Sequence, residues 1–363
     1  MNKLVTIAAL SGLAAVSGAR AGIVAGNFGE PRILVEPPAD RATCHLAWPK
    51  MTKTKDGAIV LSCVAGASHV NGKGRVAAAF STDGGKTFSP LSMPEWEGPK
   101  PGEDMGNNAM GTSADGTVAM LGMAYTGVTA NGVIGWFSTD AGATWTQSDT
   151  SAISFNKTGS VFGHVIEIPG RGFAVFGHTR PPDRPKGGIW MALSSDSGRS
   201  WGDPVDICGR RELYEPDVAI AGGKMILLTR DDKIAGYWQF TSADNGATWS
   251  EPTLVMGDNG PVHGHPSPCI MVDPSNPNRL VALQTRRYNW NDRANSHGEI
   301  NLWTADAATL EWRKVGCIAK IEGIEDYGYP SMVHIEGNRW MAVFYAGKFV
   351  GPNAIWAVDF TVE

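Results

Sequence analysis

Charged side chains are scarce in this sequence. Asp, Glu, Lys and Arg together make up 18% of its 363 residues, whereas glycine alone occurs 45 times. A low charged fraction with abundant glycine is typical of a turn-rich, all-β protein. The formal net charge of −5 argues against a nucleic-acid partner, because proteins that bind nucleic acid present basic surfaces. It does not exclude an acidic substrate, provided that arginines cluster locally.

Cysteine is also rare, and its spacing excludes the common metal-binding motifs. No two of the five cysteines have metal-ligand spacing, so we predict no metal and no other cofactor. We expect most of them to be small, buried, apolar side chains. Whether any pair forms a disulfide stays open. The five are Cys44, Cys63, Cys208, Cys269 and Cys317.

Only the N-terminus carries a long apolar stretch. Residues 1–21 have the order of a secretory signal peptide, with a basic start, an apolar stretch over Leu4–Gly18 and a small-x-small cleavage site at Ala19–Ala21. The stretch is too short and too rich in Ala and Gly for a membrane span; the alternative is a retained anchor. We therefore expect a secreted or periplasmic protein without membrane insertion, with a single domain over residues 22–363. The sequence leaves its oligomeric state open.

What the sequence has in abundance is repetition. The pattern Ser-x-Asp-x-Gly-x-Thr/Ser-aromatic occurs four times, and a fifth copy has lost its Gly. In each copy we expect the Asp to accept backbone N–H bonds within a tight turn and the Gly to supply a positive φ. We therefore interpret these Asp residues as structural. The copies are Ser81–Phe88, Ser138–Trp145, Ser194–Trp201, Ser242–Trp249 and the altered Thr304–Trp312.

A second repeat indicates the number of units. A turn followed by an apolar run of strand length occurs six times. Six such runs, together with the five copies of the Ser-x-Asp-x-Gly pattern, predict a six-bladed β-propeller made of four-stranded antiparallel blades. We expect Arg32–Glu36 to pair with the last blade near Ala354–Thr361, which would protect the terminal strand edges. The runs are Ala58–Cys63, Thr117–Met123, Phe173–Gly177, Met225–Leu228, Leu280–Leu283 and Trp340–Phe344.

Aligned on these turns, the repeats place chemically active side chains at equivalent positions. The inner strands of a propeller surround its axis, so side chains at their starts could line one pocket. Arginines end three of the strands, and a ring of guanidinium groups is suited to hold a carboxylate. The residues upstream of the turns are Asn108, His164, Glu215, His263, His265 and Tyr329, and the arginines downstream are Arg180, Arg230 and Arg286.

The Ser-x-Asp-x-Gly repeat resembles the Asp box of the sialidases, and three further segments resemble sialidase motifs. Glu30–Ile33 is similar to the first-strand arginine motif of that family. Tyr214–Val218, followed by Arg230, resembles its segment with a glutamate and a second arginine. Gly328–Val333 resembles the tyrosine segment of the last blade. The similarity covers nearly the whole chain after residue 21.

This resemblance implies a role for each matched residue. Tyr329 would attack the anomeric carbon, and Glu215 would take its proton. A neutral phenol suits this reaction because the carboxylate on the anomeric carbon of sialic acid repels an anionic nucleophile. Three arginines would hold that carboxylate, namely Arg32, Arg230 and one of Arg286 or Arg287.

The sequence departs from the family where an acid is needed. Sialidases carry an Asp acid on a loop before the first box, but the corresponding segment Gly66–Arg75 contains no Asp or Glu. His69 is the residue in that segment with a suitable ordinary pKa, so we take it as a catalytic candidate. Asp40 and Asp104 are the nearest acidic substitutes.

Three functions follow from this set of residues. The first is an exo-glycosidase of sialidase type, acting on the terminal acidic sugar of a glycan. The second is a uronate polysaccharide lyase, in which Arg or His neutralises the uronate and Tyr or His moves the protons, so that no Asp acid is required. The third is a propeller that binds an acidic glycan without catalysis. Six histidines near predicted strand ends support the lyase as an alternative, because a lyase can use histidine to move protons. They are His45, His69, His164, His178, His263 and His265.

Overall fold

The computed structural model describes most of the chain after the predicted signal peptide. The named elements along the described residues are all β-strands, which confirms the all-β class, and none of the described residues forms a helix long and apolar enough to cross a bilayer. The predicted signal peptide, Arg180 and His263 lie outside the described residues. The described ranges are 22–97, 104–126, 129–154, 158–179, 188–208, 212–257, 264–289, 291–292 and 295–363.

One sheet combines the start and the end of the chain. A parallel contact between Asn353 and His45 joins the last strands to the first. Arg32 pairs with Ala357, which confirms the predicted pairing of the first segment with the last strand. The strand order is β22 (Asp326–Glu336), β23 (Arg339–Gly347), β24 (Asn353–Thr361), β3 (His45–Lys53), β4 (Ile59–Gly66) and β5 (Arg75–Ser81), with β2 (Arg32–Val35) on β24.

A second sheet contains eight consecutive strands in two antiparallel groups. The groups meet through a short parallel contact in which Gly163 and His164 lie opposite Ala109 and Met110. The strand order is β13 (Val205–Cys208), β12 (Ile189–Ser194), β11 (Gly172–Thr179), β10 (Gly159–Ile168), β6 (Met105–Thr112), β7 (Val118–Thr126), β8 (Thr129–Ser138) and β9 (Thr146–Gln147).

The remaining strands form two antiparallel sheets. The four-stranded sheet has the order β14 (Leu213–Ala221), β15 (Lys224–Asp231), β16 (Tyr237–Ser242) and β17 (Thr253–Val255). The five-stranded sheet has the order β1 (Gly22–Ala25), β21 (Arg313–Glu322), β20 (His297–Asp306), β19 (Asn276–Tyr288) and β18 (Cys269–Asp273). Strand β1 therefore lies at the edge of one sheet beside β21, and β2 pairs with β24 in another.

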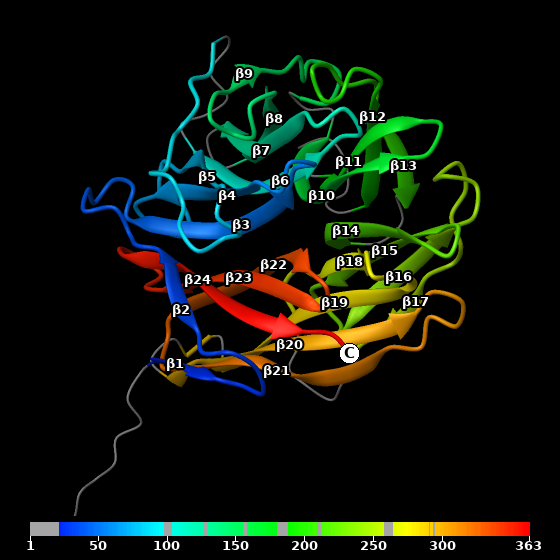
Figure 1. Cartoon of the computed structure of the whole chain (residues 1–363). Helices are drawn as coiled ribbons and strands as arrows, with labels where there is room; N and C mark the ends of the chain where they lie inside the picture. The colour runs from blue at the N-terminus through cyan, green and yellow to red at the C-terminus, as the bar shows by residue number, and fades with distance from the viewer. Residues whose placement is uncertain are drawn as a thin grey trace, which may run out of the picture.

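The first strands of the antiparallel groups gather in the middle of the molecule. Figure 1 shows β3, β6, β10, β14, β18 and β22 together there, with β9, β13, β17 and β21 farther out. Each of these first strands contacts the next, and β22 contacts β3. The strands are nevertheless paired into four sheets, because the two parallel contacts merge neighbouring groups. The prediction of six separate four-stranded blades stays a prediction.

Five of these inner strands are interrupted at one equivalent point. The pairing register shifts between Ala47 and Lys50 in β3, between Tyr214 and Asp217 in β14, and between Gly328 and Ser331 in β22. Strands β6 and β10 have a register shift of the same kind. A β-bulge bends the strand and re-aims a side chain, and such bulges are frequent beside active sites. This repeated irregularity is therefore the first structural indication of where chemistry takes place.

The Asp boxes are turn structures, as the sequence predicted. In the fourth copy Asp244 accepts hydrogen bonds from the Thr248 hydroxyl at 2.5 Å, the Thr248 backbone N–H at 2.8 Å and the Ser242 hydroxyl at 2.8 Å. Asp83, Asp140 and Asp196 accept equivalent bonds in their copies. These contacts hold the carboxylate in its ionised form, so the boxes contribute to stability in a pH-dependent way.

Replacing Asp244 with Asn is expected to lower the melting temperature at neutral pH. The bonds from Thr248 lower the pKa of Asp244 from its ordinary value to about 2. An unfolded Asp titrates near 3.9, so the stabilisation is complete above about pH 4 and is lost as the pH falls towards 2. Melting temperatures measured from pH 7 downwards should therefore show a gap between wild type and variant that closes with acid. A Glu251→Gln variant removes the same charge outside the box, and a similar gap there would contradict this role.

Candidate active site

A tyrosine and a glutamate from two different inner strands are in direct contact. The Tyr329 hydroxyl donates a hydrogen bond of 2.8 Å to Oε1 of Glu215, and Asn107 donates to the same oxygen at 3.3 Å. Tyr329 is 5% exposed and Glu215 is 3% exposed. Since Tyr329 lies on β22 and Glu215 on β14, only the folded protein brings these two groups together.

Both residues occupy the bulges of their strands in a strained backbone conformation. The φ angle is 53° at Tyr329 and 55° at Glu215, and Trp48 has a φ of 53° at the corresponding bulge of β3. Positive φ is rare for bulky residues other than glycine. Strain of this kind costs on the order of 1–3 kcal/mol per residue and is concentrated at functional sites. The folded chain therefore holds the phenol and the carboxylate in position at the expense of some of its stability.

Arg230 completes the contact on the side of β15. Its Nε lies 3.1 Å from Oε2 of Glu215, its Nη2 lies 3.1 Å from Asp232, and its Nη1 donates to the Tyr329 hydroxyl at 3.4 Å. Burial is the largest single effect and lowers the pKa of Arg230, but the charges of Glu215, Tyr329 and Asp232 together outweigh it and raise the pKa. The guanidinium is therefore a permanent cation, and 17% of its side chain remains exposed to a ligand.

The same surroundings keep the tyrosine neutral. Burial, together with the neighbouring Glu215 carboxylate, raises the pKa of Tyr329 well above its ordinary value, although Arg230 and Arg287 oppose the shift. A neutral phenol at physiological pH needs a base before it can act as a nucleophile. Glu215 is at hydrogen-bond distance to serve as that base.

Strand parity separates the two candidate arginines on β19. Arg287 is buried and donates to the Tyr327 carbonyl and, at 3.4 Å, to the Tyr345 hydroxyl. Its guanidinium carbon lies 5.6 Å from the centre of the Tyr329 ring. Arg286 points to the other face of the strand and lies 4.6 Å from the Tyr288 ring. The structure thus places Arg287, and not Arg286, beside Tyr329.

Arg32 is not among the residues that meet at Tyr329. Its guanidinium pairs with Asp359 at 3.1 Å, and the two side chains are 39% and 51% exposed. Asp359 lies opposite Met341, and Met341 lies opposite Val333, beyond the bulge from Tyr329. The motif that resembled the first-strand arginine therefore lies on an outer strand, at a surface ion pair.

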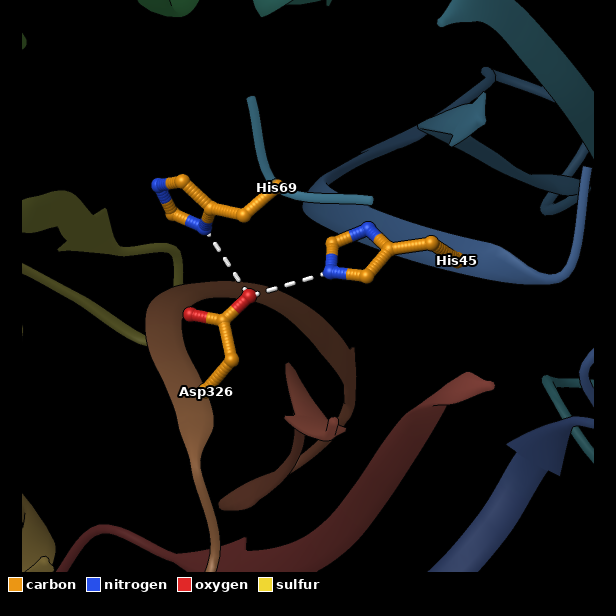
Figure 2. Close-up of side chains that lie close together, drawn as sticks. All are labelled: His45, His69 and Asp326. Carbon is orange, nitrogen blue, oxygen red and sulfur yellow. Dashed lines mark hydrogen bonds and ion pairs between the residues drawn. The ribbon is translucent and has the colours of Figure 1, made fainter. Parts of the chain in front are cut away.

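His69 is held close to a buried carboxylate. Its Nδ1 lies 2.9 Å from Oδ2 of Asp326, and Nε2 of His45 lies 3.0 Å from the same oxygen (Figure 2). The His69 ring is stacked on Phe349 at 4.8 Å and meets the edge of Trp48 at 5.2 Å. Its side chain is 19% exposed. Trp48 in turn lies 6.4 Å from the Tyr329 ring, so a single aromatic side chain separates His69 from the nucleophile candidate.

The other predicted pocket residues have structural partners. Asn108 is fully buried, donates to the Trp48 carbonyl at 2.7 Å and accepts the Ser62 hydroxyl at 2.7 Å. His164 lies 2.9 Å from Asp217. Burial lowers the pKa of His265 to about 4, so this ring is neutral at physiological pH. Asn108 and His164 thus fix neighbouring strands around the Tyr329–Glu215 contact.

Two groups of His, Cys and Asp side chains come close enough to be considered for a metal. One is His45, His69 and Asp326, and the other is His164, Asp217 and Cys269, with ligand atoms within 4.8 Å of one another in each group. In the first, both ring nitrogens point at a single carboxylate oxygen, as in a hydrogen-bonded arrangement. In the second, the carboxylate of Asp217 already accepts N–H groups of His164, Val218 and Ile270. We therefore assign no metal to either group.

A cavity of about 390 Å³ is lined by His164 but not by Tyr329, Glu215 or Arg230. Its other lining residues, including Lys53, Glu167 and His334, follow the bulges along the inner strands. This cavity therefore lies away from the Tyr329–Glu215 contact, which is the candidate active site.

Several important residues were missed in the sequence. Asp326 lies three residues before Tyr329, Asn107 precedes the chosen Asn108, and Lys50 follows Trp48 by two residues. Burial lowers the pKa of Lys50 to about 8, against the opposing charges of Asp217 and Glu215. The sequence did contain a signal for the bulges, because Trp48, Glu215 and Tyr329 are each followed by proline, which cannot donate a ladder bond and in strands often marks a bulge. That signal does not single out the three missed residues themselves.

Comparison with known proteins gives a consistent result. The model of the BNR repeat-like domain family matches residues 96–339. A search of curated protein sequences finds no match. A protein of unknown function from Dyadobacter fermentans DSM 18053 is similar in structure, with a TM-score of 0.69 and 18% identity over 93% of this chain and 100% of that chain.

Two glycoside hydrolases share the same fold. The Hadza microbial sialidase Hz136 has a TM-score of 0.67 and 16% identity, and the match covers 92% of this chain and 68% of the sialidase. An α-L-arabinanase from Penicillium chrysogenum, solved with arabinobiose, has a TM-score of 0.66 and 12% identity over 91% and 97% of the two chains. At such low identities these structures establish the fold alone, because function depends on the residues of the site and not on the fold.

Proposed function

The chain belongs to the family of BNR repeat-like domains, within the sialidase-like superfamily, and from this premise we propose that it is a glycoside hydrolase. The proposed substrate is a glycan that ends in an acidic sugar of the sialic acid type, which the enzyme removes with retention of configuration. The observation that carries the proposal is the 2.8 Å hydrogen bond from the Tyr329 hydroxyl to Glu215, with Arg230 against both groups.

In the first step Tyr329 attacks the anomeric carbon while Glu215 takes the phenolic proton. The bond to the leaving oxygen breaks, and a protonated His69 supplies the proton that this oxygen needs. In the second step water attacks the anomeric carbon and the bond from that carbon to the tyrosine oxygen breaks, while His69 accepts the proton of the water and Glu215 returns a proton to the tyrosine oxygen. Arg230, 3.4 Å from that oxygen, stabilises the negative charge that develops there.

The proposed carboxylate site has two arginines instead of three. Arg230 approaches Tyr329 from β15 and Arg287 approaches it from β19. Guanidinium groups on two sides of one phenol suit a ligand whose carboxylate is attached to the reacting carbon. Because Arg230 also pairs with Glu215 and Asp232, we expect weaker binding of the acidic sugar than an unpaired arginine would give.

We extend the proposal to the architecture and the location of the protein. The contacts of β3, β6, β10, β14, β18 and β22 in sequence, with β22 returning to β3, support a six-bladed propeller over residues 22–363 as one domain. Because the order of residues in 1–21 is that of a signal peptide, we also propose secretion or export to the periplasm. Both fit an enzyme whose substrate is an extracellular glycan.

A second candidate function is a uronate lyase. The observation in its favour is the His69–Asp326 contact at 2.9 Å, which supplies a histidine where a sialidase has an aspartic acid. In a lyase Tyr329 or His69 would remove the proton next to the uronate carboxylate, and Arg230 and Arg287 would stabilise the resulting charge. The products of the two reactions differ, so one assay can separate them.

The test uses the exported chain with two substrates in parallel. With a fluorogenic sialoside we expect release of the fluorophore and of free sialic acid, retaining the α configuration in the first-formed product. With a polyuronate we expect no new ultraviolet absorbance, because that absorbance requires an unsaturated uronate. Absorbance without fluorophore release would establish the lyase, and binding of both ligands without either product would establish a non-catalytic glycan-binding protein.

A further inference from the structure

We propose that Asp326 is a positioning residue that presents His69 as the proton donor, a role that rests on the proposed function. The pair would replace the single carboxylic acid of a sialidase with a carboxylate-held imidazole. Nothing in the matched sequence motifs assigns a function to Asp326, and its proximity to His69 arises only in the folded chain.

The His69 ring is restrained on several sides. Phe349 stacks on it with an interplanar angle of 16°, Trp48 meets it edge-on, and its own backbone N–H donates to the Phe349 carbonyl at 3.0 Å. With Nδ1 directed at Asp326, the second ring nitrogen points away from the carboxylate, as Figure 2 shows. An imidazole whose Nδ1–H is held by a carboxylate has its Nε2 available for proton transfer, which is the role of the aspartate in hydrolase triads.

The carboxylate is itself fixed and ionised. Asp326 is fully buried and accepts a hydrogen bond from the Tyr345 hydroxyl at 3.1 Å on Oδ1, while both histidines contact Oδ2. Burial would raise the pKa of Asp326, but the contacts with His69 and His45 outweigh it and hold the pKa well below its ordinary range. A carboxylate that stays ionised does not itself take the proton from His69, and it stabilises the imidazolium that the first step requires.

A chain of contacts connects this pair to the nucleophile. The Tyr345 hydroxyl that donates to Asp326 accepts a hydrogen bond from Arg287, whose guanidinium lies against the Tyr329 ring. The charged and titratable groups that face His69 through this network are therefore Asp326, His45, Tyr345 and Arg287. A further acid, Glu325, accepts the backbone N–H of Phe349, the residue whose ring stacks on His69. The acid and the nucleophile are thus held by one network.

The test compares leaving groups in the full chain. An aryl leaving group departs without protonation, whereas a sugar leaving group requires it, so only the second needs a proton donor. We expect Asp326→Asn to lower kcat/KM on a sialyl-disaccharide roughly a hundredfold but to change it little on the aryl sialoside, and to shift the alkaline limb of the disaccharide pH profile to lower pH. The matched variant Asp273→Asn removes another buried carboxylate, which pairs with Arg279 at 3.4 Å outside this network, and it should leave the ratio of the two substrates unchanged. Equal losses on both substrates with Asp326→Asn would overturn the proposal.

A second measurement does not depend on catalysis. In ¹⁵N NMR spectra of the wild-type chain, neutral His69 should show the tautomer protonated at Nδ1, and Asp326→Asn should convert it into a mixture. Dominance of the Nε2-protonated tautomer in the wild type would overturn the positioning role even if the enzyme is active. Conversely, the expected tautomer in a protein that hydrolyses no glycoside would reject the hydrolase proposal, and the proton-donor role with it, while leaving the Asp326–His69 geometry in place.

Discussion

Replacing Tyr329 with Phe is expected to reduce hydrolysis of an acidic glycoside at least about a thousandfold, which corresponds to roughly 4 kcal/mol in the activation free energy. The variant keeps the ring that packs against Trp48 and Phe162 but removes the hydroxyl that contacts Glu215. Since that hydroxyl forms the bond to sugar in the proposed mechanism, no other atom can substitute for it. Binding of the free acidic sugar, measured by calorimetry, should change by only a fewfold, because the arginines remain.

Tyr237→Phe is the matched control for this prediction. Tyr237 is also fully buried, and its hydroxyl donates to the Pro266 carbonyl at 2.8 Å without touching Glu215. Its loss should cost stability on the order of 1 kcal/mol while preserving turnover. Near-full activity in Tyr329→Phe would remove the tyrosine from the chemistry. Equal losses in both variants would show that the effect reflects folding.

Replacing Arg230 with Ala is expected to weaken binding of an acidic monosaccharide by about a hundredfold or more. Truncating one partner of a largely buried charge pair typically costs about 2–5 kcal/mol, and Arg230 would contribute to both the ligand carboxylate and the ordering of Glu215. Removal also leaves the Glu215 and Asp232 carboxylates facing the site without their shared cation. Turnover should fall as well, because Arg230 donates a hydrogen bond to the Tyr329 oxygen.

Arg32→Ala is the control for Arg230→Ala, because the sequence motif also proposed Arg32 as a substrate-binding arginine. The motif around Arg32 resembles a substrate-binding arginine, yet its guanidinium forms a surface ion pair with Asp359. Exposed pairs of this kind contribute about 0–1 kcal/mol, so binding and turnover should be unchanged. A loss of affinity in Arg32→Ala that matches the loss in Arg230→Ala would contradict the proposed two-arginine site.

The parts of this fold that could be predicted are those that repeat locally. Each Asp box forms its turn through contacts within eight residues, as Ser242–Trp249 shows, so one copy is enough to interpret the others. The position of Glu215 and Tyr329 could be predicted because each stands about seven residues upstream of its turn, and a bulge recurs at that place. Local repetition thus predicted the strands and the positions of these two residues, whereas their roles as base and nucleophile were implied by the resemblance to sialidase motifs.

The remaining features depend on contacts that no local pattern records. The choice between Arg286 and Arg287 is a question of strand parity, and a shift of one residue reverses which face a side chain occupies. Asp326 gains its importance from His69, 257 positions away in sequence. The four-sheet pairing likewise follows from short parallel contacts such as Asn353 with His45, which involve only one or two residues on each strand.

The most direct test of the account is to identify the atom to which the sugar becomes attached. In a sialic acid derivative, fluorine next to the anomeric carbon slows both steps, because it destabilises the positive charge that develops there. If the derivative also carries a good leaving group such as fluoride, the first step stays faster than the second and the glycosyl-enzyme accumulates. Mass spectrometry of the digested protein should then find the sugar on the peptide that contains Tyr329, and no adduct in Tyr329→Phe. A sugar attached to another residue, or steady release of product without any adduct, would contradict a tyrosine nucleophile.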